Sequence, residues 1–376
     1  MLMIKTVTRS VFVSLVLGTV ACGSGDGGGD DTGAKRDIER ESIPDSRFKP
    51  EGLENVIDEL VVGIEDGDVP DEFAVGVVLK ELQNFWRPVS WGASRAISEL
   101  EVIGGVQGST QEDLDVEESV KEQIEFVKEQ IDLGVNALAI APHNEDLIPY
   151  LEEFSESGGT MVTIDSDMKE IDRAIYIGTD NYQAGVTGGE TLIDLLDGKT
   201  GRVIVLGNTD PSWVGGFDRT NAAAEMLEAA GNDVTILNSV WVPEDETVQV
   251  AEAVADAGDE LVGMLGVFAN AYALGNAVVD ADLDENPVIV AFDSEPDTLK
   301  FMEDGIIAAT HAQRQYYMGY MSVYVMVAIQ AMGLDATKDV LGAHLLEGYH
   351  LDTGLDVIRA ADLEEYNAFQ DELGLN

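Results

Sequence analysis

The stretch 134-GVNALAIAPHNEDLIPYLEEFSESGGTMVTID-165 decides the fold. It opens with an apolar run over Ala137–Ala141, continues with a helical pattern over Leu147–Ser157, and returns to an apolar run over Met161–Ile164. Two continuous apolar strands separated by an amphipathic helix are typical of a parallel βαβ unit, because strands buried on both faces are apolar throughout. Asp165 follows the second strand directly, at the sheet edge where α/β proteins bind ligands.

The same alternation extends in both directions from this unit. An alternation this long favours two doubly wound parallel sheets over one sheet of a dozen strands, and a (β/α)8 barrel is the topological alternative. The predicted strands are Phe73–Leu79, Val102–Val106, Ala137–Ala141, Met161–Ile164, Arg202–Leu206, Val234–Val240, Leu261–Val267 and Val288–Phe292. The predicted helices are Phe85–Leu100, Val116–Leu133, Leu147–Ser157, Ala184–Leu196, Thr220–Ala230 and Thr247–Ala257.

Polar residues follow several of the apolar runs at or just beyond the end of the run. A single residue of this kind is consistent with a helix cap or a turn. A set of them at equivalent positions favours a ligand site, because the carboxyl ends of parallel strands meet at one edge. These residues are Lys80, Asp165, Asn208, Asp293 and Gln313.

The N-terminus has a different composition. Lys5 and Arg9 precede an apolar run, Ser10–Ala21, that is too short to cross a bilayer but suits a signal peptide. The only cysteine, Cys22, follows at once, and Thr19–Cys22 resembles a bacterial lipobox with threonine in place of the usual leucine. We expect residues 1–22 to be a lipoprotein signal peptide and Cys22 to carry the lipid. Plain secretion with cleavage near Ala21 is the alternative.

Glycine and acidic residues dominate the next segment, and acidic residues far outnumber basic ones over the whole chain. Gly23–Gly33 (GSGDGGGDDTG) is too polar to fold, so we predict a flexible, acidic, Gly-rich tether over residues 23–50. The chain has 72 acidic and 21 basic residues and a net charge of −51, which becomes −53 when Lys5 and Arg9 leave with the signal. This charge excludes nucleic acid and anionic membranes as partners and predicts a solvated, halophilic surface.

The sequence lacks the motifs of common enzymes. No GxGxxG or Walker A motif follows a predicted strand, and neither GxSxG nor HExxH occurs. The histidines His143, His311, His344 and His350 lack the spacing of metal ligands. We therefore predict no enzymatic activity, no cofactor and no metal, with a secreted enzyme as the remaining alternative of that class.

Taken together, the strand-end segments resemble the ribose-type periplasmic sugar-binding proteins of ABC transporters, from about Phe73 to Val357. The matching segments are Val77–Lys80 with Asn84–Trp86, Gly134–Pro142 (similar to GVDGIVLAP), Met161–Ser166, Gly178–Gly185, Ser212–Arg219, Gly266–Tyr272, Val290–Asp293 (similar to GFD), Ala308–Tyr320 and Leu351–Gly354. The chain departs from ribose binders at Ser166, where they have arginine, and at Gln315, where they have proline.

The resemblance implies roles for individual residues. Asp165 and Asp293 would accept hydrogen bonds from ligand hydroxyls, Phe85 and Trp86 would stack on a sugar ring, and Lys80 would donate at the rim. The complete implied ligand set is Lys80, Phe85, Trp86, Asp165, Arg219, Asn270, Asp293 and Gln313. The implied hinge set is Thr179, Asp180, Asn181, Gln313 and Asp352.

The resemblance also implies a type I periplasmic-binding-protein fold, with two lobes joined by a three-crossover hinge. We assign residues 71–178 plus 315–341 to the first lobe and residues 179–314 plus 342–376 to the second. The implied function is an extracytoplasmic lipoprotein, anchored at the periplasmic or outer cell surface, that captures a sugar or polyol and delivers it to an ABC transporter permease. A sensor that presents its closed form to a chemoreceptor or histidine kinase is the alternative. We expect a monomer that touches the membrane only through its lipid. The repressors that share this fold are excluded, because they need a basic N-terminal DNA-binding domain.

Overall fold

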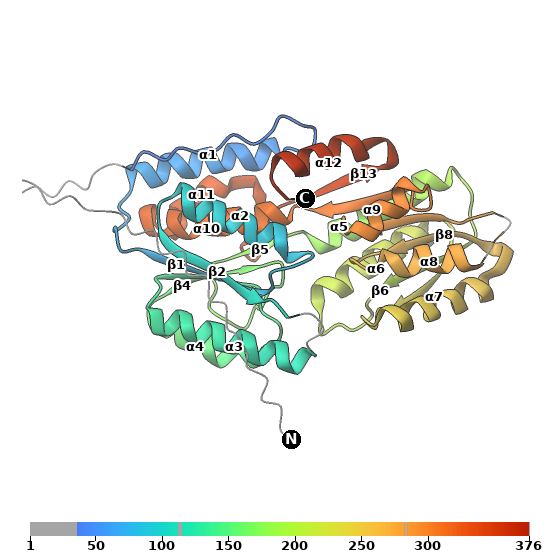
Figure 1. Cartoon of the computed structure of the whole chain (residues 1–376), viewed down its shortest axis with the longest axis horizontal. Helices are drawn as coiled ribbons and strands as arrows, with labels where there is room; N and C mark the ends of the chain where they lie inside the picture. The colour runs from blue at the N-terminus through green and yellow to red at the C-terminus, as the bar shows by residue number, and fades with distance from the viewer. Residues whose placement is uncertain (1–35, 112–114, 282, 284, 376) are drawn as a thin grey trace, which may run out of the picture.

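Two α/β lobes lie side by side in the computed structural model, which describes residues 36–111, 115–281, 283 and 285–375 (Figure 1). The first lobe contains a sheet in the order β11-β12-β5-β4-β3-β1-β2, and the second a sheet in the order β13-β10-β9-β8-β6-β7. Both sheets are open, so the barrel alternative is wrong and the predicted fold class of two doubly wound lobes is confirmed. The predicted signal peptide and Cys22 lie outside the described residues.

The first sheet grows outward from the βαβ unit that the sequence suggested. β3 is buried at every residue and pairs in parallel with its neighbours on both sides. Among the described strands of this sheet, β11 alone runs antiparallel to its partner, β12, at one edge. The strands of this sheet are β1 (Ala74–Glu81), β2 (Ile103–Ser109), β3 (Ala137–Ile140), β4 (Thr160–Ile164), β5 (Ile175–Gly178), β11 (Leu345–Leu346) and β12 (His350–Asp352).

Helices cover both faces of the first sheet (Figure 1). One face is covered by α2 (Trp86–Glu99) and α10 (Gln315–Met332). On that side α1 (Glu51–Asp66) packs outside α10, and α11 (Leu334–Leu341) packs beside α10. The other face is covered by α3 (Val116–Leu133) and α4 (Ile148–Glu156). The burial of α10 along most of its length follows from its place between the sheet and α1. None of the described helices is long and apolar enough to cross a membrane.

α2 and α10 cross closely because each has a glycine at the contact. A Cβ atom on Gly319 would lie 1.9 Å from the carbonyl oxygen of Val89, and one on Gly92 would lie 2.1 Å from that of Tyr316. Both distances are impossible for real atoms, so any larger residue would force the helices apart.

The second lobe repeats the layered arrangement. α5 (Asn181–Leu196) and α6 (Val214–Ala229) lie on one face, and α7 (Pro243–Ala257), α8 (Ala271–Ala281) and α9 (Pro296–Glu303) on the other. α12 (Leu363–Glu372) packs beside the edge strand β13, which pairs antiparallel with β10. The strands of this sheet are β6 (Arg202–Gly207), β7 (Asp233–Asn238), β8 (Leu261–Gly266), β9 (Val288–Phe292), β10 (Ala309–Gln313) and β13 (Leu355–Arg359).

The chain passes between the lobes three times, as the predicted fold class requires. It crosses from β5 to α5, from β10 to α10, and from β12 to β13. The side chain of Asp352 joins two of these crossings, because it accepts hydrogen bonds from the N–H groups of Asp180 at 3.0 Å and Gly354 at 2.9 Å.

Three of the predicted boundaries are wrong. Residues 36–50, assigned to the tether, are packed on the folded body, because Ile43 and Phe48 are buried and Arg36 donates to the carbonyl oxygen of Leu100 at 2.7 Å. Residues 345–352, assigned to the second lobe, form β11 and β12 of the first sheet, because β12 pairs in parallel with β5. The first lobe also extends N-terminal to residue 71 through α1, which packs on α10.

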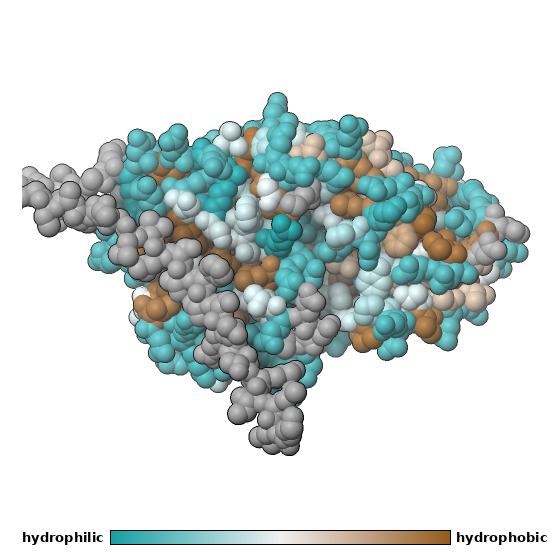
Figure 2. Space-filling view, viewed as in Figure 1, coloured by the Kyte–Doolittle hydropathy of each residue, from teal (hydrophilic) through white to brown (hydrophobic). Residues whose placement is uncertain are grey.

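Hydrophilic residues cover most of the face seen in Figure 2, and hydrophobic residues form separate patches on it. This agrees with the excess of 72 acidic residues over 21 basic ones. The acidic side chains are distributed over the described helices and loops, with three in the first turn of α7 alone.

Candidate functional site

Asp165 and Asp293 occupy equivalent positions in the two lobes. Each directly follows a strand, β4 or β9, and each has a left-handed backbone, with φ of 58° and 62°. The N–H of Asp165 donates to Ile177 on the next strand at 2.9 Å, and that of Asp293 donates to His311 at 2.9 Å. Such conformations cost about 1–2 kcal/mol and gather at functional sites.

A hydroxyl from the neighbouring strand fixes each of these turns. Tyr176 donates to the carbonyl oxygen of Asp165 at 2.6 Å, and Thr310 donates to that of Asp293 at 2.6 Å. The same backbone geometry therefore presents one carboxylate from each lobe at a sheet edge. Sequence reasoning predicted both aspartates, and the structure adds the reason for their orientation.

Gln313 and Arg219 connect the Asp293 carboxylate to the hinge. The side-chain amide of Gln313 donates to Asp293 at 3.0 Å, and its oxygen accepts from Arg219 at 2.8 Å. Arg219 also donates to Asn181 at 2.6 and 3.0 Å and to the carbonyl oxygen of Val267 at 3.0 Å. Most Arg219 donors are therefore used within the protein, so the structure places this residue as a support for the Asp293 carboxylate and the hinge.

Lys80 lies beside the aspartate of the first lobe. Its ammonium donates to Ser166 at 2.7 Å, and Ser166 in turn donates to the Asp165 carboxylate at 3.0 Å. Ser166, which occupies the place of an arginine in ribose binders, thus connects the lysine to the aspartate. The Lys80 nitrogen also lies 5.6 Å from the ring centre of Trp86, a cation–π distance.

Burial shifts the ionisation of these groups. It raises the pKa of Asp293 to about 6, with Arg219 and Gln313 opposing the shift and the Asp165 charge adding to it. Burial also lowers the pKa of Lys80, which the nearby Asp165 opposes. Groups of opposite lobes therefore act on one another, since Asp165 belongs to the first lobe and Asp293 to the second.

Two further acidic groups that the sequence did not suggest lie near this centre. Burial raises the pKa of Glu295 to about 7, and the charges of Asp293 and Glu81 add to that shift. Burial likewise raises the pKa of Glu81. Glu295 precedes α9 and Glu81 ends β1, so both follow the strand-end pattern at slightly longer spacing.

The predicted aromatic residues of the first lobe are largely enclosed. Trp86 is only 7% exposed, and its ring meets that of Phe85 edge to face at 5.1 Å. Both rings pack against the core of the first lobe, so they present less free surface than the sequence suggested.

A second aromatic group, which sequence reasoning missed, lies on the loops of the second lobe. Trp213 stacks on Phe268 at 4.7 Å and 20°, and Trp241 lies 5.4 Å from the same Phe268 ring. Phe268 is buried, whereas Trp213 and Trp241 are 42% and 54% exposed. The Arg219 guanidinium lies 6.0 Å from the Phe268 ring, so this group adjoins the polar centre. We call Trp213, Trp241 and Phe268 the aromatic face. Trp241, which directly follows the predicted strand Val234–Val240, was the available signal.

The remaining predicted residues lie at lobe junctions or loop ends. Asp180 caps α5 by accepting from the N–H of Gln183 at 3.0 Å, and Thr179 is buried with a hydroxyl that lacks a protein partner. Asn270 is 1% exposed; its amide nitrogen donates to Ser239 at 3.1 Å, and its oxygen has no protein partner. In the parts of the chain that the structure describes, no group of histidine, cysteine, aspartate and glutamate could hold a metal ion.

Comparisons with known proteins agree with this geometry. A family profile described as the periplasmic binding protein domain matches residues 75–334, more than half of the chain. No match was found among curated protein sequences.

Solved structures of sugar-binding proteins share the fold. GanP, a glucose-galactose binding protein from Geobacillus stearothermophilus, is 25% identical with a TM-score of 0.63, and the match covers 78% of this chain and 99% of GanP. AraP, an arabinose binding protein from the same organism, is 24% identical with a TM-score of 0.66, covering 79% and 99%. A periplasmic ribose ABC transporter protein from Conexibacter woesei is 15% identical with a TM-score of 0.68, covering 80% and 96%.

Proposed function

The chain belongs to the periplasmic binding protein domain family, and on that basis we propose that it captures a sugar or polyol between its lobes. The observation that carries this proposal is the matched pair Asp165 and Asp293, one carboxylate from each lobe in the same left-handed geometry. An ionised carboxylate accepts short hydrogen bonds from two hydroxyls at once, which suits a polyhydroxylated ligand.

The other groups supply what a sugar ring needs. Lys80 and Gln313 offer donors beside the two carboxylates. The aromatic face offers a flat apolar surface for the C–H side of the ring, which buries apolar area while the hydroxyls bond at the edges. Phe85 and Trp86 border the opposite side, next to Lys80. Arg219 and Asn270 complete the proposed ligand set, Arg219 mainly by holding Gln313.

The lobes would close on the ligand by bending at the three crossings, with Thr179, Asp180, Asn181, Gln313 and Asp352 as the hinge residues. We further propose that Cys22 anchors the protein by lipid at the extracytoplasmic membrane surface, and that the closed form delivers its ligand to an ABC transporter permease. The alternative, a sensor that signals to a chemoreceptor or histidine kinase, uses the same closed form. Capture of a permease or of a kinase by the ligand-bound protein separates the two.

Binding is tested by a thermal-shift screen of the purified chain against pentoses, hexoses and inositols, followed by calorimetric titration. A sugar at 100 times its dissociation constant should stabilise the protein by about 2.7 kcal/mol. Asp165→Ala and Asp293→Ala should each weaken binding at least tenfold, because each removes an acceptor that the closed lobes would bury against the ligand. Asp297→Ala, an exposed carboxylate four residues from Asp293, is the matched control. A screen without any stabilising sugar or polyol, or unchanged affinity in both variants, contradicts the proposal.

A further inference from the structure

Trp241 is held in an unfavourable backbone conformation. It lies in the loop between β7 and α7 with φ of 58°, and the residue is 54% exposed. A bulky residue in the left-handed region costs about 1–2 kcal/mol, and an exposed side chain gains little from packing in return. Other contacts must therefore hold this loop.

Those contacts converge on Glu246, in the first turn of α7. Glu246 is fully buried, and one of its oxygens accepts the N–H groups of Val240 and Trp241, each at 3.0 Å. The same oxygen accepts from the hydroxyl of Ser239. The carboxylate thus fixes three consecutive residues of the loop, including the strained one.

Glu246 also reaches the loop that follows β8. The Asn270 amide donates to it at 3.4 Å, and the Tyr272 hydroxyl donates to its second oxygen at 2.5 Å. All five partners are donors, as an ionised carboxylate requires. One buried side chain therefore joins the two loops that support Trp241 and Phe268.

We propose that Glu246 is a positioning residue of the sugar site, which orients the Trp241 indole on the aromatic face. The inference rests on the proposed function, since it gives Trp241 a ligand to contact. It assigns Glu246 no ligand contact of its own.

Near-ultraviolet circular dichroism tests the positioning without any ligand, because the indoles of Trp213 and Trp241 lie 6.0 Å apart at 53° and should give a coupled signal. Glu246→Ala should lose the signal to the same extent as Trp241→Phe. Glu246→Gln should retain most of it, because the amide oxygen can still accept from both N–H groups. An unchanged signal in folded Glu246→Ala, verified by far-ultraviolet spectra, would overturn the inference.

Titration with D-galactose and D-arabinose adds the functional readout. Glu246→Ala should weaken binding of whichever sugar binds by about as much as Trp241→Ala does, and the double variant should be no weaker than Trp241→Ala alone. Additive losses would show that Glu246 acts elsewhere. If neither sugar binds, the spectra still decide the positioning, and the screen against pentoses, hexoses and inositols decides the proposed function separately.

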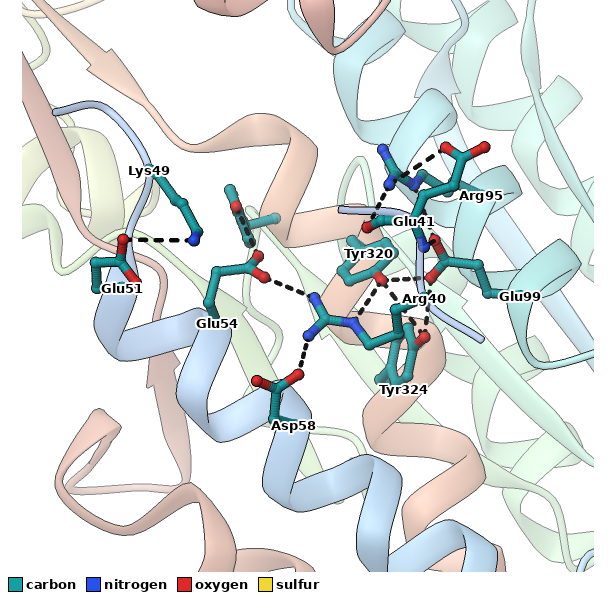
Figure 3. Close-up of polar contacts among 11 residues, drawn as sticks. Arg40, Glu41, Lys49, Glu51, Glu54, Asp58, Arg95, Glu99, Tyr320 and Tyr324 are labelled. Atoms are coloured by element: carbon teal, nitrogen blue, oxygen red, sulfur yellow. Dashed lines mark hydrogen bonds and ion pairs between the residues drawn. The ribbon is translucent and has the colours of Figure 1, made fainter. Parts of the chain in front are cut away.

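A separate observation concerns the segment 36–50, which precedes the family-matched range 75–334. Its first part is attached to the first lobe by Arg40, whose side chain is 12% exposed. Arg40 pairs with Glu54 at 2.8 Å and with Asp58, both on α1, and donates to the hydroxyl of Tyr320 on α10 at 3.1 Å (Figure 3). Because Arg40 contacts both α1 and α10, it holds the first part of the segment against the first lobe.

The second part of the segment is attached to the second lobe. Arg47 pairs with Asp362 at 2.8 Å and donates to the carbonyl oxygen of Val357 on β13 at 3.2 Å. Phe48 is 2% exposed and meets the ring of Tyr366 on α12 edge to face at 5.1 Å. Tyr366 in turn hydrogen-bonds Ser294, the residue after Asp293, at 2.9 Å.

We infer that residues 36–50 form a clasp that connects the lobes outside the three crossings and limits how far they open. Hinge bending would have to stretch or release the contacts of Arg47 and Phe48. Because the clasp needs no ligand, this inference stands apart from the proposed function.

The test measures lobe separation by pulsed electron paramagnetic resonance in the unliganded chain, with spin labels at Lys121→Cys in α3 and Glu228→Cys in α6, in a Cys22→Ser background. Arg47→Ala combined with Phe48→Ala should broaden the distance distribution. Arg359→Ala is the matched control, since Arg359 is similarly exposed and pairs with Asp194 within the second lobe at 2.8 Å.

Hydrogen exchange of residues 36–50 verifies that the contacts are broken. A distribution that stays unchanged although the segment exchanges freely would overturn the clasp. A broadened distribution in Arg359→Ala as well would assign the effect to general loss of charge pairing, and would overturn it equally.

Discussion

Asp293→Asn should make the empty protein more stable at neutral pH, although it removes a proposed ligand contact. Burial raises the pKa of Asp293 from 3.8 to about 6 in the folded chain. A carboxyl group with a raised pKa binds its proton more tightly when folded, so its contribution to stability falls as pH rises from about 4 to about 6 and is then constant. At about 1.4 kcal/mol for each pH unit, the ionised Asp293 costs about 3 kcal/mol at pH 7.5.

Asparagine has the same shape, tolerates the left-handed backbone and can still accept from Gln313, so the substitution removes mainly the charge. Chemical denaturation should show Asp293→Asn to be more stable than the parent by up to about 3 kcal/mol at pH 7.5. The advantage should shrink to about 1 kcal/mol at pH 4.5, where the parent carboxyl is already protonated.

Asp180→Ala is the control of opposite sign. It removes a carboxylate that caps α5, so it should lower stability by about 1 kcal/mol. An Asp293→Asn protein that is less stable than the parent at pH 7.5, or a difference that does not change with pH, would refute the reasoning. The first result would mean that the attraction of Arg219 outweighs the burial of the charge, and the second that the two effects cancel.

Three further predictions concern packing, salt and anchoring. Gly319→Ala should destabilise the first lobe by about 1–3 kcal/mol in denaturant titration, because its Cβ would lie 1.9 Å from the Val89 carbonyl oxygen; Ser322→Ala, one turn along α10, should be milder. The melting temperature should rise as the salt concentration increases from low to molar, since salt screens the repulsion among the negative charges of a chain with a net charge of −51. A melting temperature that does not change with salt would show that nearby basic groups already neutralise the acidic ones. Cys22→Ser should release the protein from the membrane fraction, and equal partitioning of both forms would show that Thr19 prevents lipid attachment.

Structural features that depend on consecutive residues could be predicted from the sequence. Apolar runs such as Ala137–Ala141 indicate buried strands by themselves, and the polar residue that follows each run lies at the same sheet edge by geometry alone. Asp165 and Asp293 were found in this way. The strands β5 and β10 were missed because neither is a continuous apolar run: β5 (IYIG) contains a tyrosine and ends in glycine, and β10 (ATHAQ) contains polar side chains that are buried.

Features made by residues far apart in the sequence required the tertiary structure. Glu246 accepts a hydrogen bond from Asn270, which is 24 residues away in the sequence, and Arg40 donates to Tyr320, which is 280 residues away. The spacing of residues along a strand or helix predicts neither contact. The segment 36–50 is polar enough to be predicted as a tether, yet Phe48 and Arg47 find partners on α12 and β13.

The sequence by itself therefore determined the two-lobed α/β fold and its pair of strand-end aspartates, because periodicity and burial are local properties of a strand or helix. Only the tertiary structure decided that Arg219 is occupied by the hinge, that Glu246 holds the aromatic face, and that the N-terminal segment connects both lobes. Each of these features depends on which hydrogen-bond and ion-pair partners the charged side chains have. Those partners are determined only when segments that are distant in the sequence pack together.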